Sequence, residues 1–379
     1  MRNLIFIAVI ALFFVFLALS LFRKRMKGSV KALSIVGSFV LIAATFCLWA
    51  FPSWEFPEIT GPYEVAGAVS TYTDERRVET YEEDGSARWL NVAFWYPKNY
   101  SGDKNTCPII VFSHGSFGVK QSNESLYREL ASHGYVVCAI DHTYQCVGTT
   151  GPDGKTVPLD NDYRKQVMSA SDSDEKSREQ LYAYFTEWMS VRMGDIDFVL
   201  DTIIARSAAD DTGAGGAYLL MDTSRIGVMG HSIGGSAALG IGRTRGDVGA
   251  VIALEAPFMY DVSGVENGNL VFRDPAYPVP LLSVYTDSSW GIIDDSPQYA
   301  QNKAIRNDRS DTTYDLYVKN AGHMTLTDLA YSMPPLCLMF GQNIFLDAGD
   351  YVQKLNRIYL EFFDCYLKKE GSYTPVSFE

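Results

Sequence analysis

The segment "VMGHSIGGSAAL", residues 228–239, places Ser232 among glycines where an apolar run gives way to a helical pattern. In a G-x-S-x-G turn the serine occupies a sharp strand-to-helix corner, and small neighbours allow the backbone to turn that tightly. Gly230 and Gly234 are these neighbours, and such a turn exposes the hydroxyl of Ser232. A glycine-rich turn without chemistry fits the same pattern, so the interpretation depends on which other residues reach the serine.

A serine hydroxyl is a weak nucleophile until a base removes its proton and an acidic side chain orients that base. The chain order of serine, acid and histidine is that of the α/β-hydrolase triad. Among the five histidines, His323 is the one that follows both candidate acids, Glu255 and Asp287, so we expect His323 to be the base. The other histidines have structural explanations in turns, at helix ends or at strand ends: His114, His133, His142 and His231.

A tetrahedral acyl intermediate requires hydrogen-bond donors for its oxyanion, usually two backbone N–H groups. One donor is expected from the residue after the nucleophile, which is Ile233. The other is expected from the segment "SHGSFG" after an early strand, where Ser116 would supply it. His114 and Gly115 in this segment are interpreted as residues that shape the turn.

The elements that must position these residues alternate between short β-rich runs and helical stretches from residue 61 onward. This alternation predicts an α/β domain with a mainly parallel sheet and helices on both faces, the α/β-hydrolase fold. The ligand crevice of such a sheet lies beyond the carboxyl ends of its strands, so the serine, the histidine and both candidate acids should meet at one rim. The predicted strands are 91–97, 107–115, 135–142, 225–232, 249–256, 280–287 and 313–323, and the predicted helices lie within 123–134 and 171–205.

Two uncharged apolar stretches, residues 4–22 and 32–51, precede this domain, and each is long enough to span a membrane as a helix. The positive-inside rule places the basic cluster between them in the cytoplasm, so the domain is expected to face outward from the cell membrane. A cleaved signal peptide is the alternative, although the basic cluster follows the first apolar stretch instead of preceding it. The cluster consists of Arg23, Lys24, Arg25 and Lys27.

Aromatic residues after the second stretch are typical of a membrane interface. We therefore divide the chain into a membrane hairpin with its interfacial segment, residues 1–60, and a catalytic domain, residues 61–379. The interfacial aromatic residues are Trp49, Phe51, Trp54 and Phe56.

The composition excludes some classes of function. A formal net charge of −13 argues against a nucleic-acid partner, because binding a polyphosphate requires Lys and Arg. The six cysteines show no C-x-x-C pair and no spacing with histidine that suits zinc, so no metal site is expected. Cys138 and Cys146 are mainly interpreted as core residues, with a disulfide between them as the alternative. The oligomeric state stays open.

Residues 61 to about 363 resemble the plasma-type platelet-activating factor acetylhydrolases and their bacterial, dienelactone-hydrolase-like relatives. The resemblance depends on "GPYEV", "VFSHGSFG" with "ELASHGYVVCAIDH", "RIGVMGHSIGG", "VIALEAPFM" and "GHMTLTDL", in family order. It implies cleavage of short or oxidised acyl groups from phospholipids without a metal or other cofactor. It also implies the same nucleophile, base and oxyanion donors as the residue pattern.

The chain departs from this family at the acid. The family has an aspartate where "ALEA" places Glu255, one methylene longer, whereas Asp287 ends the next strand, where many other α/β-hydrolases keep their acid. The resemblance favours Glu255, with Asp287 as the alternative. Residues 143–165 have no required counterpart in the family and are interpreted either as a lid or as a solvated loop.

These observations predict a membrane-anchored serine esterase or lipase with a lipid ester as substrate. The first alternative is a general carboxylesterase acting on small soluble esters or polyester fragments. The second is an inactive α/β-hydrolase fold that serves as a membrane-anchored binding module; the presence of the serine, the histidine and the glycines argues against it. Acyl length and head-group preference are not encoded in any of these patterns.

Overall fold

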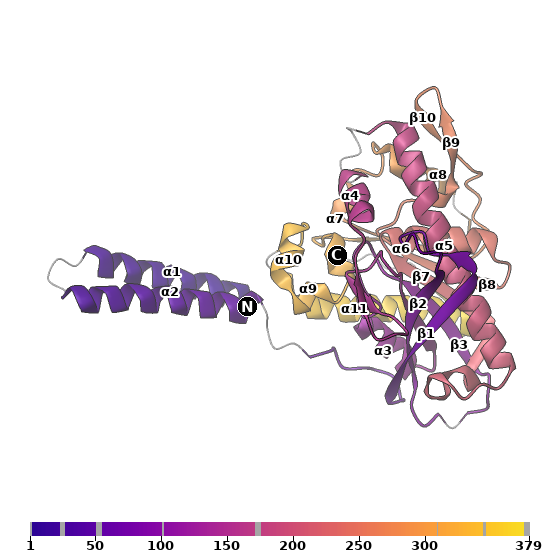
Figure 1. Cartoon of the computed structure of the whole chain (residues 1–379), viewed down its shortest axis with the longest axis horizontal. Coiled ribbons are helices and arrows are strands. Elements are labelled where there is room, and N and C mark those ends of the chain that lie inside the picture. Colours follow the sequence, from indigo (N-terminus) through magenta and orange to yellow (C-terminus); the bar gives the residue numbers. More distant parts are fainter. Residues whose placement is uncertain are drawn as a thin grey trace.

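The structure is a computed structural model with an N-terminal pair of helices beside an α/β domain (Figure 1). Helix α1 covers Arg2–Phe22 and helix α2 covers Gly28–Ala50. They lie side by side, and the hydroxyls of Ser20 and Ser34 share a hydrogen bond of 2.8 Å between them. The described residues are 2–22, 27–50, 55–100, 102–170, 176–308, 310–343 and 346–374.

The helix pair is apolar. The stretch Gly28–Trp49 is long and apolar enough to cross a membrane, and α1 contributes a shorter apolar stretch, Phe6–Phe22. Such N-terminal helices weakly suggest a membrane anchor or a signal sequence. Near the interface predicted for the anchor, the rings of Phe6 and Trp49 stack with centroids 4.4 Å apart. Five residues of the predicted basic cluster and aromatic group lie outside the described residues: Arg23, Lys24, Arg25, Phe51 and Trp54.

Within the described residues, the central sheet has eight strands in the order β1-β2-β4-β3-β7-β8-β11-β12. In this order across the sheet, the last six strands, β4 to β12, run parallel to one another, whereas β2 is antiparallel to both of its neighbours. This confirms the predicted mainly parallel sheet. The strands are β1 (Val65–Val78), β2 (Ala87–Pro97), β3 (Cys107–Ser113), β4 (Val136–Asp141), β7 (Met221–His231), β8 (Val248–Leu254), β11 (Leu281–Thr286) and β12 (Thr313–Val318).

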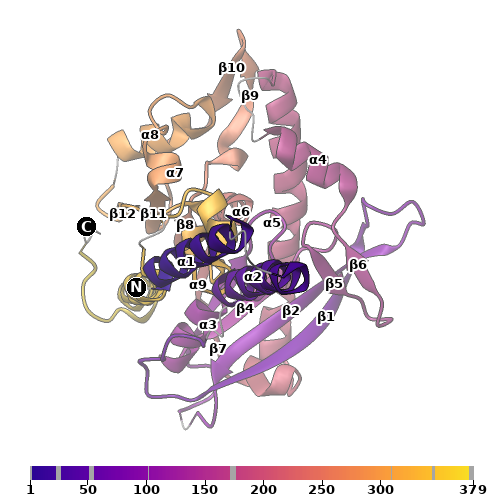
Figure 2. The same cartoon turned by 90° about the vertical axis from the view of Figure 1, so that its left-hand side faces the viewer.

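Helices cover both faces of the sheet (Figures 1 and 2). Successive side chains of a strand point to opposite faces, so Ile109 and Val111 of β3 pack in the core under α5 and α6. Ile110 and Phe112 pack in the core under α3 and α11. These helices are α3 (Glu124–Ser132), α5 (Arg178–Ala208), α6 (Ile233–Thr244) and α11 (Ala348–Phe363).

The segment 143–165 is more ordered than a solvated loop. It contains the hairpin of β5 (Gly148–Thr150) and β6 (Thr156–Pro158) and the start of α4 (Asn161–Ala170). Gln145 and Tyr163, near the two ends of the segment, are buried, so the solvated-loop interpretation is wrong for both ends. Gly, Pro and Asp concentrate in its middle, which is where the chain is exposed.

All six cysteines are free, and Cys138 and Cys146 are buried. The alternative of a disulfide between these two residues is therefore wrong. Cys138 is an interior residue of β4, where burial raises the pKa of its thiol and keeps it protonated. The remaining α-helices of the described domain are α7 (Asp287–Trp290), α8 (Ala300–Asn307), α9 (Leu329–Ser332) and α10 (Pro334–Met339), and β9 (Val262–Glu266) pairs with β10 (Asn269–Phe272).

Candidate active site

Ser232 lies at the corner between β7 and α6, where φ is 55° and ψ is −125°, a conformation that non-glycine residues rarely adopt. Its N–H donates to the carbonyl of Leu254 at 2.8 Å, which ties the corner to β8. The glycines allow the close approach of the first helical turn. A Cβ on Gly234 would lie 2.1 Å from the carbonyl oxygen of Ser113, and one on Gly230 would lie 2.3 Å from the backbone of Gly234. Both positions therefore require glycine.

Glu255 follows β8 and is buried, with a φ of 50°. Its Oε2 accepts from Nδ1 of His323 at 3.3 Å, and its Oε1 accepts from the hydroxyl of Ser289 at 2.6 Å and from the N–H of Thr286. Burial alone would raise the pKa of Glu255, but the hydrogen bond and charge of His323, with the other two donors, lower it below its ordinary value. Glu255 is therefore a buried, ionised carboxylate that faces an imidazole.

Asp287 is exposed and is directed elsewhere. Its carboxylate accepts from the hydroxyl of Tyr317 at 2.6 Å and from the N–H of Asn320 at 3.1 Å. The structure thus brings Glu255, not Asp287, to His323. The two serines after Asp287 contribute instead: Ser289 donates to Glu255, and the hydroxyl of Ser288 accepts from the N–H of His323 at 2.9 Å.

His323 begins the short 3-10 helix His323–Leu326 after β12, and its side chain is 29% exposed. The turn is held against the serine corner by His231, whose Nε2–H donates to the carbonyl of His323 at 3.0 Å. The two imidazole rings have centroids 4.5 Å apart. Within the described residues, no hydrogen bond joins the hydroxyl of Ser232 to His323. We call Ser232, His323 and Glu255 the rim set.

The segment that was predicted to supply an oxyanion donor lies directly beside the serine. We call His114, Gly115 and Ser116 the oxyanion segment. A Cβ on Gly115 would lie 3.3 Å from Cβ of Ser232 and 2.8 Å from Nδ1 of His231. Ile233 is the first residue of α6, where a helix leaves its N–H groups without an intrahelical acceptor. Ile233 thus adjoins Ser232 in the chain, and Gly115, the residue before Ser116, lies against Ser232 in space.

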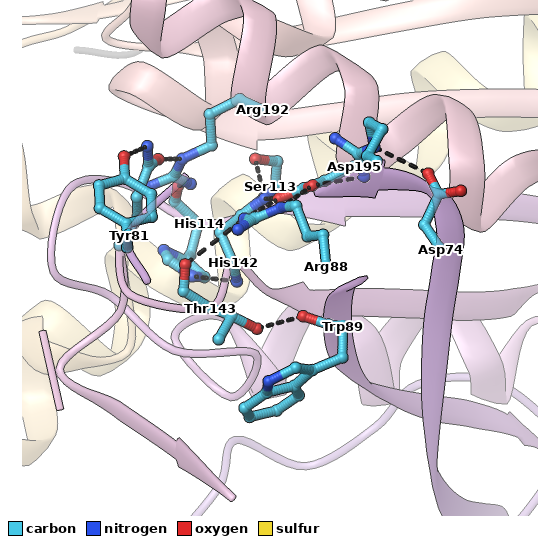
Figure 3. A network of polar contacts seen from close by, with 12 residues as sticks. Asp74, Tyr81, Arg88, Trp89, Ser113, His114, His142, Thr143, Arg192 and Asp195 are labelled. Carbon is cyan, nitrogen blue, oxygen red and sulfur yellow. Dashed lines mark hydrogen bonds and ion pairs between the residues drawn. The ribbon is translucent and has the colours of Figure 1, made fainter. Parts of the chain in front are cut away.

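A buried polar network lies behind the oxyanion segment (Figure 3). Nδ1 of His114 contacts the carbonyl of Gly115 at 2.6 Å, and Nε2 of the same ring accepts from the N–H of His142 at 3.4 Å. The guanidinium of Arg192 donates to the carbonyl of His114 at 2.7 Å. The interpretation of His114 as a residue that shapes the turn is consistent with these contacts, but the buried arginine was not predicted from the sequence.

The same network contains a second arrangement of serine, histidine and acid, which we call the interior set: Ser113, His142 and Asp195. The hydroxyl of Ser113 lies 2.8 Å from Nε2 of His142, and Nδ1 of His142 lies 2.8 Å from Asp195. Arg88 donates twice to Asp195, each time at 2.6 Å. Burial and then the charge of Arg192 lower the pKa of His142 to about 3. The interior set is fully buried, so no substrate reaches it.

Several residues in or near these two sets were not predicted from the sequence. Arg192 and Asp195 interrupt the apolar spacing of the helix, and this interruption is the signal that could have indicated a buried polar site. Ser288 and Ser289 follow a strand at the predicted rim, where hydroxyls can serve as donors. Within the described residues, no cluster of three or more His, Cys, Asp or Glu side chains is arranged to hold a metal ion.

Comparison with known proteins confirms the predicted resemblance and fold. The family described as platelet-activating factor acetylhydrolase, isoform II, has a model that matches residues 90–183, which include the oxyanion segment. A ferulic acid esterase from Streptomyces cinnamoneus is similar in structure, with a TM-score of 0.59 at 23% sequence identity over 84% of this chain and 94% of that chain. At this identity the structural likeness establishes the fold. The chain thus has the α/β-hydrolase fold, and its residues 90–183 are similar to these acetylhydrolases.

Proposed function

We propose that the chain is a membrane-anchored serine esterase that hydrolyses short-acyl or oxidised phospholipids through an acyl-enzyme. The hydroxyl of Ser232 attacks the ester carbonyl while Nε2 of His323 takes its proton. The N–H groups of Ser116 and Ile233 bind the oxyanion of the tetrahedral intermediate. The imidazolium then gives its proton to the leaving alcohol, and a water molecule activated by the same imidazole releases the acid and restores the hydroxyl.

The contact between His323 and Glu255 carries this proposal. A carboxylate accepts hydrogen bonds only, so Nδ1 of a neutral His323 holds the proton and Nε2 keeps its lone pair for the serine. The buried charge of Glu255 stabilises the imidazolium that forms during the reaction. His231 supports the same assignment, because it fastens the histidine turn to the serine corner.

The phospholipid substrate is supported by the family match and by the apolar helix pair, which would keep the domain at a lipid surface. A general carboxylesterase acting on small soluble esters is the second candidate, and the likeness in fold to a ferulic acid esterase favours it. The two candidates share the same chemistry at Ser232. They differ in the leaving group and in the need for a membrane.

The test compares kcat/KM of the full-length chain in detergent micelles on p-nitrophenyl esters of increasing length, on methyl ferulate and on a short-acyl phosphatidylcholine. We expect the phospholipid to be preferred by about ten-fold or more, with no hydrolysis by Ser232→Ala. Preference for the soluble esters would establish the second candidate. If none of these esters is hydrolysed, the inactive binding module would be the remaining candidate function.

The orientation of the anchor has its own test. The basic loop should lie in the cytoplasm, so a cysteine at Ser29 in intact cells should react only with membrane-permeant maleimides, and external protease should release the domain. Protection of the domain until the cells are lysed would place it in the cytoplasm.

A further inference from the structure

Arg192 lies on α5 with its guanidinium turned toward the oxyanion segment, and its side chain is completely buried (Figure 3). Its Nη1 donates to the carbonyl of His114 at 2.7 Å. Its Nε donates to the side-chain oxygen of Gln145 at 2.6 Å, and its Nη2 donates to the hydroxyl of Tyr163 at 3.3 Å. The guanidinium is therefore held in one orientation by neutral groups of the segment 143–165.

The charge of Arg192 has no counter-ion in contact with it among the described residues. Arg88, which is also buried, differs because it pairs with both Glu79 and Asp195. A buried charge without an ionic partner costs several kcal/mol of desolvation that is not repaid by attraction to an anion. Stability of the fold therefore does not explain why a cation occupies this position.

The hydrogen bonds of His114 determine which of its nitrogens carries the proton. The carbonyl of Gly115 can only accept, so the proton lies on Nδ1. Nε2 then accepts from the N–H of His142. Burial, followed by the charge of Arg192, holds the pKa of His114 well below its ordinary value and keeps this ring neutral. Two successive carbonyls, those of His114 and Gly115, are thus each bound by a buried donor.

The second of these carbonyls belongs to the peptide unit whose N–H is that of Ser116. A hydrogen bond to the oxygen of a peptide polarises the unit and strengthens its N–H as a donor. The bond from Arg192 to the preceding carbonyl fixes the orientation of the chain that enters this unit. A fixed donor of this kind is effective in catalysis because it needs no reorganisation when the oxyanion forms.

We propose that Arg192 is a positioning residue for the oxyanion, acting through the carbonyl of His114 to hold the Gly115–Ser116 peptide and to place an uncompensated positive charge behind it. The negative charge of the tetrahedral intermediate is then the counter-ion that the resting protein lacks. This inference rests on the proposed function, because it assigns Arg192 to the transition state of ester hydrolysis at Ser232.

The test measures kcat and KM of the full-length chain on p-nitrophenyl acetate for Arg192→Met and Arg192→Lys. We expect Arg192→Met to lower kcat roughly ten- to hundred-fold, with KM changed less than about two-fold. This loss of kcat is smaller than the loss expected when an oxyanion donor itself is deleted, because the N–H of Ser116 remains. Arg192→Lys keeps the charge and should recover part of kcat. The inhibition constant of a trifluoromethyl ketone, which forms an oxyanion adduct with the serine, should rise in parallel with the loss of kcat.

Arg243→Met is the matched control. Arg243 is a mostly buried arginine on α6 that pairs with Asp261, so its loss should lower the melting temperature without changing kcat. Unchanged kcat in Arg192→Met, or an equal loss in the control, would overturn the inference while wild-type hydrolysis still supports the proposed function. If Arg192→Met does not fold, Tyr163→Phe removes one contact that orients the guanidinium and should lower kcat a few-fold; an unchanged kcat there would overturn the inference.

Discussion

The rim set and the interior set share a contact between a histidine and a buried carboxylate, yet they differ in access, in the contact between serine and histidine, and in the environment of the acid. In each set, Nδ1 of a histidine faces a buried carboxylate, at 3.3 Å at the rim and 2.8 Å in the interior. The rim histidine is 29% exposed, whereas the interior histidine is not exposed at all. The better hydrogen-bond geometry thus belongs to the set that no substrate can reach, so contact geometry alone does not identify an active site.

The partners of the two carboxylates explain the difference further. Asp195 accepts from the guanidinium groups of Arg77 and Arg88, so its charge is already compensated. Burial by itself would raise the pKa of Asp195, but Arg88 holds it far below its ordinary range. Glu255 has only neutral donors besides His323 among its described hydrogen bonds. Its charge therefore remains available for an imidazolium, which is what a reaction at the rim requires.

Substitution of the two serines should give the largest difference between the rim set and the interior set. Ser232→Ala should lower kcat on the order of a million-fold and abolish labelling by a fluorophosphonate, because the members of a triad act as a unit. Ser113→Ala should lower kcat less than about ten-fold, since it removes one buried hydrogen bond to His142. Turnover and labelling are measured after circular dichroism has confirmed that both variants fold. Labelling that persists in Ser232→Ala would contradict the assignment of the rim set.

The candidate acids provide the next largest effect. Glu255→Gln should lower kcat about ten-thousand-fold, because the imidazole loses the carboxylate that fixes its tautomer. Asp287→Asn should leave kcat within about ten-fold, because Asp287 binds Tyr317 and Asn320 and does not contact the histidine. Both are measured at saturating substrate. If Asp287→Asn lost most of its kcat while Glu255→Gln kept nearly all of it, the acid would be Asp287 and not Glu255.

The sequence predicts the parallel part of the fold because its buried strands are short apolar runs that end in polar residues, such as the run that leads to Ser232. It does not predict β1, whose burial alternates irregularly along an edge of the sheet and whose last residues are rich in charge. It also does not predict α11, because an amphipathic helix at the end of the chain carries no motif that marks its place on the sheet.

The candidate site divides in the same way. Local spacing predicts the serine corner and the donor positions beside it, because backbone geometry at a strand-to-helix turn depends on nearby glycines. The choice between Glu255 and Asp287 depends on contacts across the sheet, which sequence spacing does not determine. The interior set brings together the end of β3, the residue after β4 and a residue of α5, and Arg88 of β2 binds its carboxylate, so its existence depends on the tertiary fold.

Stability separates the two carboxylates as well. Asp195→Asn should lower the free energy of unfolding by about 3–5 kcal/mol, because it leaves the buried Arg88 and the partly exposed Arg77 with one fewer anion. Glu255→Gln should cost less, because its described partners other than His323 are neutral groups that an amide oxygen can also bind. Urea denaturation measures both. A loss below about 1 kcal/mol for Asp195→Asn would show that the interior set does not act as an ionic network.

A third buried carboxylate, that of Asp328, tests whether burial or partners decide the charge. Asp328 is buried like Asp195, but it accepts from the N–H and hydroxyl of Ser125 instead of from arginines. Burial raises its pKa to about 7, and the charge of Glu124 adds to this rise. The other ionisable groups that face it are Tyr127 and Tyr331.

The sign of the pH dependence follows from this raised pKa. Between about pH 4 and pH 7, folded Asp328 keeps a proton that the unfolded chain has released, so this group stabilises the fold at low pH and the contribution is lost as pH rises through about 7. Asp328→Asn mimics the protonated carboxyl and should remove the slope. The difference in unfolding free energy between wild type and variant should therefore fall by about 1.4 kcal/mol per pH unit from pH 5 to pH 7 and stay constant above pH 8. Parallel stability curves for the two proteins would mean that Asp328 is ionised in the folded state, and that burial without an arginine is compatible with charge in this interior.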